Sequence, residues 1–312
     1  MLHTQIRAFD AVAREGSFSR GAAALGLTQP ALTIQVKALE EAYGVKLLNR
    51  FRRSVQLTEM GERLFRMSRR YASLEEQMRE ILVESVELES GRLSLTADGP
   101  HIAMGVFARF LERHPNIELS VAMGNTRFVR EQLLERRTDL AILPGVERHP
   151  QIHAMPLWRH SAVVIVANDH PWAARKSVGL AELDGQPMIA REEGSNTRRV
   201  THLAMARARV RPRTVLELGS REAVCEAVGA GLGFGMIWQL EAAGSTRFRT
   251  LPLQGAAINS IDYVACLKTE RMRRSIRAFF RVAASLSNQR NATPPKPAPH
   301  PPSDPPTPRQ RR

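Results

Sequence analysis

The hydrophobic residues of this 312-residue chain change their spacing once, near residue 90, and that change limits the fold more than any other feature of the sequence. Before it, apolar residues recur every three or four positions, the spacing of one face of an α-helix. After Gly91, short apolar runs typical of strands alternate with helical segments. The chain is therefore neither all helix nor all sheet, and its length suffices for two or three compact units.

Three short amphipathic segments precede residue 60. Ser17 or Ser19 can cap the second segment, and Gly26 after it supplies the permissive backbone that a tight turn requires. Thr28 suits the N-cap of the third segment, where Pro30 falls in the first turn and its missing N–H costs little. The positions expected to face a common core are Leu2, Ile6, Phe9 and Ala13, then Phe18, Ala22 and Leu25, then Leu32, Val36, Leu39 and Tyr43. These patterns predict three helices with a tight turn between the last two.

The third predicted helix carries a polar face beside its apolar one. Gln29, Thr33 and Lys37 stand four residues apart on that face, and their side chains suit base edges and phosphates. Two short helices at an angle, the second exposing such a face, are how a helix-turn-helix enters the major groove of DNA. The alternative is a small helical bundle with a solvated charged face.

A short basic hairpin follows the three helices. Residues 45–50 and 55–57 have the pattern of two strands, and Phe51–Ser54 would form the tip between them. Arg52 and Arg53 at that tip can reach backbone phosphates or a narrow minor groove. Three helices in sequence with a glycine turn and a basic hairpin favour a winged helix-turn-helix over the simple bundle.

A long helix is expected between residues 58 and 89, where Gly61 is the only glycine and proline is absent. About thirty residues would make a rod of roughly 45 Å. Two apolar series repeat every seven residues, namely Leu64, Tyr71, Met78 and Ser85, and Met67, Leu74, Ile81 and Leu88. A sustained heptad with flanking charges favours pairing with a second helix. Packing of the helix on its own domain is the alternative.

The remaining 200 residues or so predict a largely parallel sheet covered by helices. The expected strands are Arg92–Ala97, Ile117–Ala122, Leu140–Leu143, Ala162–Ala167, Met188–Ala190, Val215–Leu218, Gly233–Ile237 and Ile261–Leu267, and a basic helix should span Met272–Ala284. Between two of these segments, His149 and His153 flank Pro150 in an expected surface loop. The pattern indicates two α/β lobes.

Small polar residues mark several expected helix starts in this region. They fall in residues 97–101, 124–126, 194–198 and 219–222. Free backbone N–H groups at such starts bind anions, and Arg198 and Arg221 can add charge-assisted hydrogen bonds. Each Ser or Thr taken alone is more often a simple N-cap. Starts that converge on one cleft would instead form a site for a small anion.

Two N-terminal runs closely resemble one family. GSFSRGAAALGLTQPALTIQVKALEEAYGVKLLNR (Gly16–Arg50) and RRSVQLTEMG (Arg52–Gly61) are similar to the DNA-binding domain of LysR-type transcriptional regulators, and the resemblance extends over the chain except its tail. It implies an α+β protein with a winged helix-turn-helix in residues 1–60, a linker and dimerisation helix in 61–89, and a two-lobed, periplasmic-binding-protein-like (type 2) effector domain in 90–287. It also implies double-stranded DNA as partner and a homodimer or tetramer.

Particular residues acquire roles from this resemblance. The residues implied to contact DNA are Thr28, Gln29, Pro30, Thr33, Lys37, Arg50, Arg52 and Arg53. Two positions depart from the family pattern. Ile34 stands where many members have a polar or basic residue, which puts part of the base readout in doubt, and Leu48 replaces a common Phe.

A narrower similarity concerns the effector. LELGSREAVCEAVGAGLGFGMI (Leu216–Ile237) and REEGSNTR (Arg191–Arg198) resemble LysR-type regulators associated with aminoethylphosphonate catabolism. That similarity implies an anionic phosphonate ligand that also bears an amine or aldehyde, with Asp98 or Glu222 available to an ammonium. The expected effector-binding residues are Asp98, His101, Asn125, Thr126, Ser195, Thr197, Arg198, Ser220 and Arg221.

Charge and composition limit the partners. The net charge of +14 favours nucleic acid first and an anionic membrane surface second. No apolar run approaches the roughly 18 residues of a membrane span, and the N-terminus lacks the apolar core of a signal peptide, so we expect a cytoplasmic protein. Cys225 and Cys266 are lone cysteines far apart, which fit buried thiols better than a disulfide or a zinc site. The sequence predicts neither a metal nor a cofactor.

The leading hypothesis is a ligand-responsive transcription factor and not an enzyme, because neither a nucleophile elbow, a zinc-protease motif nor a phosphate loop occurs. Two alternatives stay open: a DNA-binding repressor or architectural protein with an empty cleft, and an enzyme built on the α/β region. Residues 288–312 contain nine prolines and a charge excess of five basic residues over one acidic residue. They predict a disordered basic tail.

Overall fold

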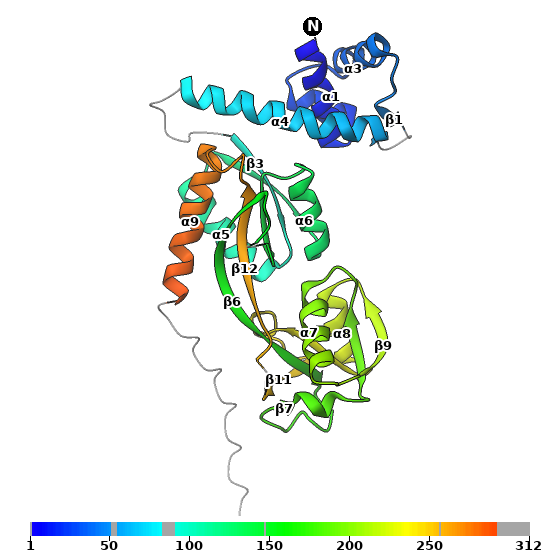
Figure 1. Ribbon diagram of the computed structural model, residues 1–312, viewed down its shortest axis with the longest axis vertical. Helices are drawn as coiled ribbons and strands as arrows, with labels where there is room; N and C mark the ends of the chain where they lie inside the picture. The colour runs from blue at the N-terminus through cyan, green and yellow to red at the C-terminus, as the bar shows by residue number, and fades with distance from the viewer. Residues whose placement is uncertain (1, 51–54, 83–90, 147, 256, 292–312) are drawn as a thin grey trace, which may run out of the picture.

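The structure is a computed structural model that describes residues 2–50, 55–82, 91–146, 148–255 and 257–291 (Figure 1). An N-terminal unit lies across one end of an elongated C-terminal unit, with helix α4 (Glu59–Leu82) running along the border between them. The other elements of the N-terminal unit are α1 (Leu2–Glu15), α2 (Phe18–Ala24), α3 (Gln29–Tyr43) and the antiparallel strands β1 (Leu48–Arg50) and β2 (Val55–Leu57).

Local chemistry fixes the starts of α2 and α3. The Ser17 side chain accepts a hydrogen bond from the backbone N–H of Arg20, and the Thr28 side chain accepts one from that of Ala31. Pro30 lies in the first turn of α3. Gly26 takes a φ of +65° in the connection, a backbone region that favours glycine. The predicted cap at Thr28 and the glycine turn are therefore confirmed.

The core of the N-terminal unit forms where α1, α2 and α3 meet, and its fully buried side chains include Phe9, Leu32 and Val36. Two residues expected in this core are exposed instead. Leu2 is 46% exposed and Tyr43 is 61% exposed. Both stand at the outer ends of their helices. Helical spacing predicts which face of a helix is apolar, but it does not predict where the helix extends beyond the elements that cover this face.

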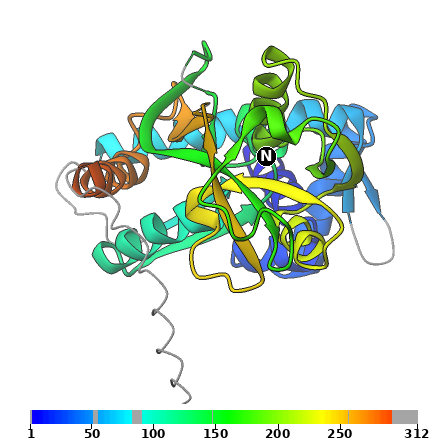
Figure 2. The same ribbon diagram turned by 90° about the horizontal axis from the view of Figure 1, so that it is seen from below.

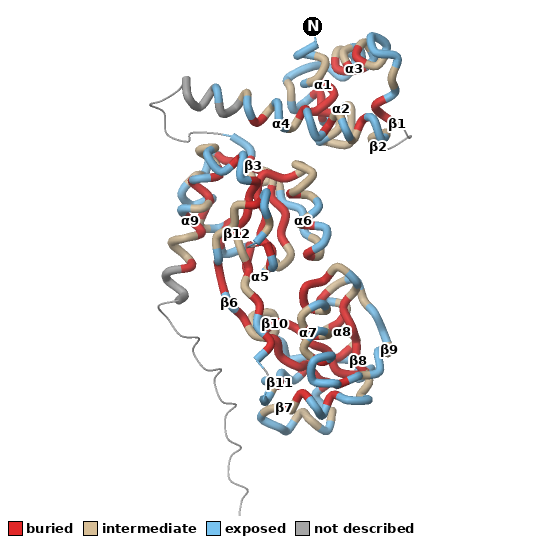
Figure 3. Tube along the Cα trace, in the orientation of Figure 1, coloured by how far each residue is buried: buried red, intermediate tan, exposed pale blue. Residues whose placement is uncertain are grey.

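Helix α4 packs closely on the hairpin at its first turn and projects apolar side chains beyond it. A Cβ at Gly61 would lie 2.1 Å from the carbonyl oxygen of Leu47, so only glycine fits there. Further along, α4 carries large apolar side chains that are between 43% and 57% exposed, namely Met67, Tyr71, Leu74 and Met78. Exposed stretches of α4 are pale blue in Figure 3. Residues 83–89 of the predicted helix lie outside the described residues.

The C-terminal unit has two lobes. Lobe I contains β3 (Gly91–Ala97), α5 (Pro100–Arg113), β4 (Ile117–Met123), α6 (Thr126–Leu134), β5 (Leu140–Pro144), the first part of β6 (Ile152–Ala167), β12 (Asn259–Leu267) and α9 (Arg274–Asn291). Its core lies between the sheet and the helices α5 and α9, which run along one flank (Figure 2). The rings of Phe110 and Phe279 join these two helices with centroids 5.1 Å apart.

Lobe II is a smaller α/β unit at the far end of β6. It contains the rest of β6 with β7 (Val178–Gly179), η1 (Leu180–Leu183), β8 (Pro187–Arg191), α7 (Asn196–Arg207), β9 (Arg213–Leu218), α8 (Arg221–Gly229), β10 (Phe234–Trp238), η2 (Gln239–Glu241) and β11 (Phe248–Gln254). Strands β8, β9 and β10 pair in parallel. Two separate apolar clusters cover the two faces of this sheet.

One strand belongs to both lobes. Residues Ile152–Ser161 of β6 pair antiparallel with β12 in lobe I, and Ala162–Ala167 pair antiparallel with β10 and β11 in lobe II. Along the main path the sheet order is β4-β3-β5-β12-β6-β10-β8-β9. The prediction of a largely parallel sheet was wrong in its centre, because the chain returns through β12 and crosses both lobes along β6.

The same region holds the other departures from expectation. His153 lies in β6 rather than in a loop, and its ring packs on that of Phe280 with centroids 5.2 Å apart. The first ten residues of β6 and all of β11 were missed. Helix α9 continues to Asn291, beyond the predicted end at Ala284 and into the segment expected to be tail. Residues 292–312 lie outside the described residues.

Candidate functional site

The N-terminus of α3 presents the predicted DNA-reading residues on one surface. Thr28, Gln29, Pro30 and Lys37 are exposed, and Thr33 is half-buried. The Nε2 of Gln29 lies 3.3 Å from the Oγ1 of Thr33, and that hydroxyl donates to the carbonyl of Gln29. On the same exposed side, Lys37 pairs with Glu41 at 3.2 Å between exposed side chains. Exposed pairs of this kind contribute little stability. These side chains can therefore give up their present contacts and bind a ligand such as DNA at little cost.

The hairpin lies beside α3, but its basic residues are only partly described. Arg50 ends β1, paired with Val55 across the two strands. Arg52 and Arg53 lie outside the described residues, as does the tip between β1 and β2. Ile34, the departure from the family pattern, is 65% exposed on α3. It therefore adds an apolar side chain to the surface that carries Gln29 and Lys37.

The second candidate region lies where the two lobes touch. The backbone N–H of Arg127 in lobe I donates to the carbonyl of Gly194 in lobe II at 3.1 Å. The first N–H of α7, at Asn196, donates to the hydroxyl of Thr126 at 3.1 Å. Asn125 caps α6 and also donates to Glu192 at 3.2 Å. The starts of α6 and α7 therefore meet across the lobe boundary.

A cavity of about 360 Å³ opens at this meeting point, and it is rich in arginine. We call it the basic cavity; its charged lining residues are Arg127, Arg130, Arg198, Arg199 and Glu193. The guanidinium Nη2 atoms of Arg130 and Arg199 each lie 3.7 Å from the point where a Cβ on Gly145 would stand, so the two groups converge. Ser195, at the N-cap of α7, makes no capping hydrogen bond with its side chain. Such a lining can hold an anion.

A second, much smaller cavity of about 20 Å³ lies deeper between the lobes, and we call it the inner cavity. Its polar lining consists of Asp98, His101, His160, Arg221, Glu241 and Asp262, and the ring of Trp238 closes one side. His160 stacks on Trp238 with ring centroids 4.6 Å apart and planes 2° from parallel. The side chains come from the start of α5, from β6, α8, β10, η2 and β12.

The carboxyls of the inner cavity are short of positive charge. Desolvation by burial raises the pKa of Asp98, Glu241 and Asp262 above the usual range, well above it for Asp262. The Arg221 guanidinium opposes the rise at each of the three, and its Nε lies 2.7 Å from Oε1 of Glu241. Burial lowers the pKa of His160 to about 4, with Arg221 as the second cause, so its imidazole is neutral near pH 7.

One hydrogen bond links the linings of the two cavities. The hydroxyl of Thr126, which lines the basic cavity, donates to Oδ2 of Asp98, which lines the inner cavity. A ligand with two short ends could therefore place one end in each cavity. The opposite charge of the two linings means that such a ligand would need opposite charges on its ends.

The predicted effector residues divide into three groups. Asp98, His101 and Arg221 line the inner cavity, while Thr126, Ser195 and Arg198 line the basic cavity. Asn125 lines neither cavity and donates to Glu192. Thr197 and Ser220 line neither cavity, and the Ser220 side chain caps α8 by accepting from Ala223.

Sequence reasoning missed several residues of both cavities. These are Arg127, Arg130 and Arg199 in the basic cavity and His160, Trp238, Glu241 and Asp262 in the inner cavity. One signal was available for Asp262. It interrupts the apolar strand IDYVACL at a position that alternates with the buried Val264, so its carboxyl had to point inward.

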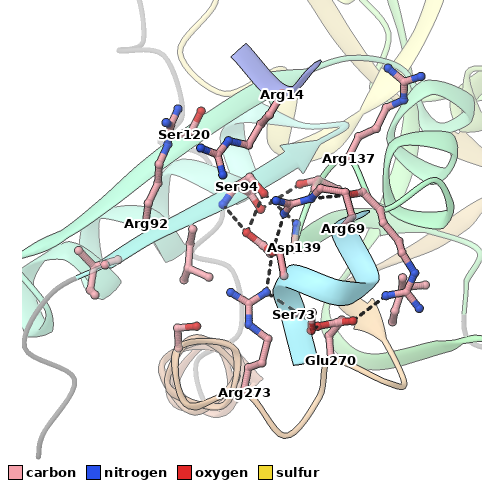
Figure 4. Close-up of a pocket in the computed structure, with 18 of the residues that line it drawn as sticks. Arg14, Arg69, Ser73, Arg92, Ser94, Ser120, Arg137, Asp139, Glu270 and Arg273 are labelled. Atoms are coloured by element: carbon pink, nitrogen blue, oxygen red, sulfur yellow. Dashed lines mark hydrogen bonds and ion pairs between the residues drawn. The ribbon is translucent and has the colours of Figure 1, made fainter. Parts of the chain in front are cut away.

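A larger cavity of about 540 Å³ lies between α4 and lobe I, lined by several arginines (Figure 4). Their charges are matched within the structure. Arg69 of α4 lies 3.6 Å from Asp139, and Arg273 lies 2.6 Å from the same carboxylate. Arg136 pairs with Glu270 at 2.6 Å. These ion pairs join the N-terminal unit to lobe I, and because they are compensated we assign no ligand here.

No group of three or more His, Cys, Asp or Glu side chains within the described ranges is arranged to hold a metal ion. Over the same ranges, none of the helices combines the length and the apolar character that a membrane crossing needs. Both thiols are free, with Cys266 buried and Cys225 half-buried.

Comparison with known proteins identifies the family. Residues 3–62 match the bacterial regulatory helix-turn-helix protein family of the LysR type, and residues 87–287 match the LysR substrate binding domain. The transcriptional regulator CfxR of Cupriavidus necator is 32% identical over 275 residues, which cover 86% of each chain. A full-length variant of OxyR from Pseudomonas aeruginosa has the same fold, with a TM-score of 0.76 at 22% identity over 92% of this chain and 94% of that one.

The C-terminal unit also resembles a ligand-bound domain. The regulatory domain of CcmR from Synechocystis PCC6803, solved in complex with 2-PG, gives a TM-score of 0.60 at 25% identity over 64% of this chain and 98% of that one. The matching families and the named relatives are transcriptional regulators rather than enzymes. The chain belongs to the LysR family of DNA-binding transcriptional regulators, with a helix-turn-helix domain joined to an effector-binding domain.

Proposed function

We propose that this regulator reads DNA with the N-terminal half of α3 and responds to a small anion bound between its lobes. The observation that supports the first part is the exposed surface formed by Thr28, Gln29, Pro30 and Lys37, with Thr33 half-buried beside them. Amide and hydroxyl side chains at the start of such a helix can pair with base edges in the major groove. Arg50, Arg52 and Arg53 of the hairpin are assigned to the phosphate backbone.

Two kinds of substitution test this division of roles. Gln29→Ala and Thr33→Ala should weaken specific binding by roughly 1–3 kcal/mol and leave nonspecific binding nearly intact, because each removes a base contact. Arg52→Ala and Arg53→Ala should weaken binding to every DNA alike and reduce the salt slope by about one unit each. Salt titrations on operator and random duplexes measure both. If the four variants lowered both kinds of binding equally, the assignment of α3 as the reading helix would be wrong.

The effector part of the proposal rests on the basic cavity. Four arginines and one acidic side chain line it. Arg127 pairs with Glu193 and Arg198 with Glu217, whereas Arg130 and Arg199 have no ion pair among the described residues. The α6 and α7 starts supply backbone dipoles that favour negative charge. Ser195, Thr126 and Arg198 are the predicted residues best placed to contact an anion. A phosphonate fits this chemistry, because its charge of nearly two requires several donors at once. Asn125 contributes by holding Glu192, and Thr197 and Ser220 act only through the backbone of their helix starts.

A ligand-induced melting shift tests the effector part. The panel contains 2-aminoethylphosphonate, phosphonoacetaldehyde, phosphate, sulfate, common carboxylates and neutral and cationic compounds of similar size. A ligand at a hundred times its dissociation constant stabilises the domain by roughly 2.7 kcal/mol, which is readily visible. Ser195→Ala should reduce the shift, while Ser245→Ala, on an exposed loop of lobe II, should not. A shift with neutral or cationic compounds only would refute the anion proposal and leave DNA binding standing.

The same proposal includes a homodimer formed through α4. Met67, Tyr71, Leu74 and Met78 expose apolar surface along α4 at heptad-like spacing, which suits the seam of a paired helix. A tetramer would require a further interface on the C-terminal units. Because bacterial DNA lies in the cytoplasm, we place the working protein there.

A further inference from the structure

We infer that the inner cavity receives an ammonium group, so that the effector is a short zwitterion whose anionic end enters the basic cavity. The inference rests on the proposed effector function and specifies the chemical class of the effector. An aminoalkyl phosphonate, an aminoalkyl sulfonate or a β-amino acid belongs to this class. A simple anion does not.

The first support is the charge of the inner cavity. Its lining includes three carboxyls, those of the buried Asp262 and the half-buried Asp98 and Glu241, against one guanidinium, Arg221. Glu241 is already engaged by Arg221 at 2.7 Å and by the backbone N–H of Trp238 at 3.0 Å. Asp98 accepts a hydrogen bond from the Thr126 hydroxyl, but neither Asp98 nor Asp262 forms an ion pair with an arginine within 4 Å among the described residues. One additional cation between them would supply the charge that these two carboxylates lack, since a buried charge is costly without a partner.

The second support is independent of the carboxyls. His160 is 6% exposed, and neither of its ring nitrogens has a hydrogen-bond partner among the described residues, although Nε2 lies 3.4 Å from Oδ2 of Asp262. Buried polar atoms without partners are rare and mark a place where a partner is missing. A neutral imidazole has one lone pair to accept from an N–H donor, and an ammonium has three such donors.

The ring of Trp238 adds a third contact of the same kind. It lies in the wall of the inner cavity and stacks on His160. The face of an indole attracts a cation by its quadrupole, most strongly when water is excluded. The inner cavity therefore offers a cation three kinds of contact: a carboxylate, the His160 imidazole and the Trp238 indole. The same groups disfavour the binding of an anion there.

Size and position set the length of the effector. The inner cavity has a volume of about 20 Å³, enough for a single water molecule or a group of that size. An ammonium group meets that limit, whereas a phosphonate or carboxylate group is larger. The basic cavity begins on the other side of the Asp98–Thr126 hydrogen bond. Because the linings of the two cavities touch at this pair of side chains, an effector that reaches both cavities must have its two charges a few bonds apart.

Matched pairs of ligands test the inference on the full-length protein. Titration calorimetry would compare 2-aminoethylphosphonate with ethylphosphonate, taurine with ethanesulfonate, and β-alanine with propionate. In each pair the anionic group is the same and only the ammonium differs. We expect at least one zwitterion to bind about tenfold or more tightly than its partner anion, since desolvated charge pairs of this kind have large coupling energies.

Two substitutions, each of which removes one negative charge, test whether the preference for the zwitterion arises in the inner cavity. Asp262→Asn removes a buried carboxylate of nearly the same shape, and it should reduce the preference for the zwitterion to less than about threefold. Glu222→Gln removes a carboxylate that is 72% exposed, 3.9 Å from Arg221 and outside the lining of the cavity, and it should leave the preference unchanged. If Asp262→Asn does not fold, Asp98→Asn takes its place. The comparison of the matched ligand pairs on the wild-type protein remains decisive in either case.

The possible results separate the inference from the function on which it rests. Equal affinities within every pair would overturn the inference and leave the anion-binding function in place. A preference that persists in Asp262→Asn but disappears in Glu222→Gln would also overturn it, because the ammonium would then lie on the surface of α8. A panel in which no compound binds would overturn both the zwitterion and the anion proposal.

Discussion

Asp139 is a heavily engaged carboxylate at the border between α4 and lobe I. It accepts hydrogen bonds from the backbone N–H of Ser94 at 2.9 Å, from the Ser94 hydroxyl at 2.7 Å and from Arg273 at 2.6 Å, and Arg69 of α4 lies 3.6 Å away. Burial by itself would raise its pKa, but the guanidiniums of Arg273 and Arg69 and the Ser94 hydrogen bonds hold the pKa of Asp139 below its usual range.

Asp139→Asn would keep the shape of the side chain and remove its charge. Loss of one member of a buried ion pair costs roughly 3–5 kcal/mol. We expect a value near the lower end, about 3 kcal/mol, because both guanidiniums keep a second carboxylate. Arg69 lies 3.7 Å from Asp10, and Arg273 lies 3.9 Å from Glu270. Glu118→Gln is the control, since Glu118 is 70% exposed and lies 3.7 Å from Arg92. It should change stability by less than about 0.5 kcal/mol.

Urea unfolding at a series of pH values measures the effect and its cause. The folded-state pKa of Asp139 is depressed, so its stabilisation is complete above the unfolded-state pKa of about 3.9 and is lost as the pH falls through the lower, folded-state pKa. The difference between wild type and Asp139→Asn should therefore be largest at pH 7 and shrink below pH 4. A difference that is constant down to pH 3, or a loss below about 1 kcal/mol at pH 7, would refute the ion-pair reasoning.

Two other substitutions give simple outcomes. Leu74→Glu should split the proposed α4 dimer, because it would bury a carboxylate at the seam, and sedimentation showing an unchanged dimer would locate the interface elsewhere. Gly61→Ala should destabilise the N-terminal unit by roughly 2 kcal/mol, because its Cβ would meet the Leu47 carbonyl at 2.1 Å and force the hairpin away from α4; a thermal midpoint equal to that of the wild type would contradict this close approach.

Features that depend on neighbouring residues could be predicted from the sequence. The Thr28 and Asn125 caps and the Gly26 turn follow from the chemistry of one or two side chains and their own backbone. The expected effector residues Asp98, Thr126 and Ser195 stand at helix starts for the same reason. A cap can be recognised wherever it occurs along a chain, so these positions did not require knowledge of the tertiary fold.

Features created by packing could not be predicted in the same way. The first ten residues of β6 include Pro156, Arg159 and His160, which break the alternation by which a half-buried strand is recognised. Glu241 and Asp262 belong to the inner cavity only because η2 and β12 meet there. Nothing local to either residue reveals that meeting. Tyr43 shows the converse, since its helical spacing was right although the core ends before it.

Strand β6 also has a mechanical consequence. Its sixteen residues, at about 3.3 Å each, form a continuous ribbon some 50 Å long that is hydrogen-bonded to the sheets of both lobes. A rotation of one lobe against the other must therefore change the twist of β6, because β6 is hydrogen-bonded to the sheets on both sides of the boundary. The register with β12 shifts between Asp262 and Tyr263, and such irregularities concentrate twist. Asp262 of β12 lies at this irregularity, so a ligand held by Asp262 would act on β6 at the place where its pairing is irregular.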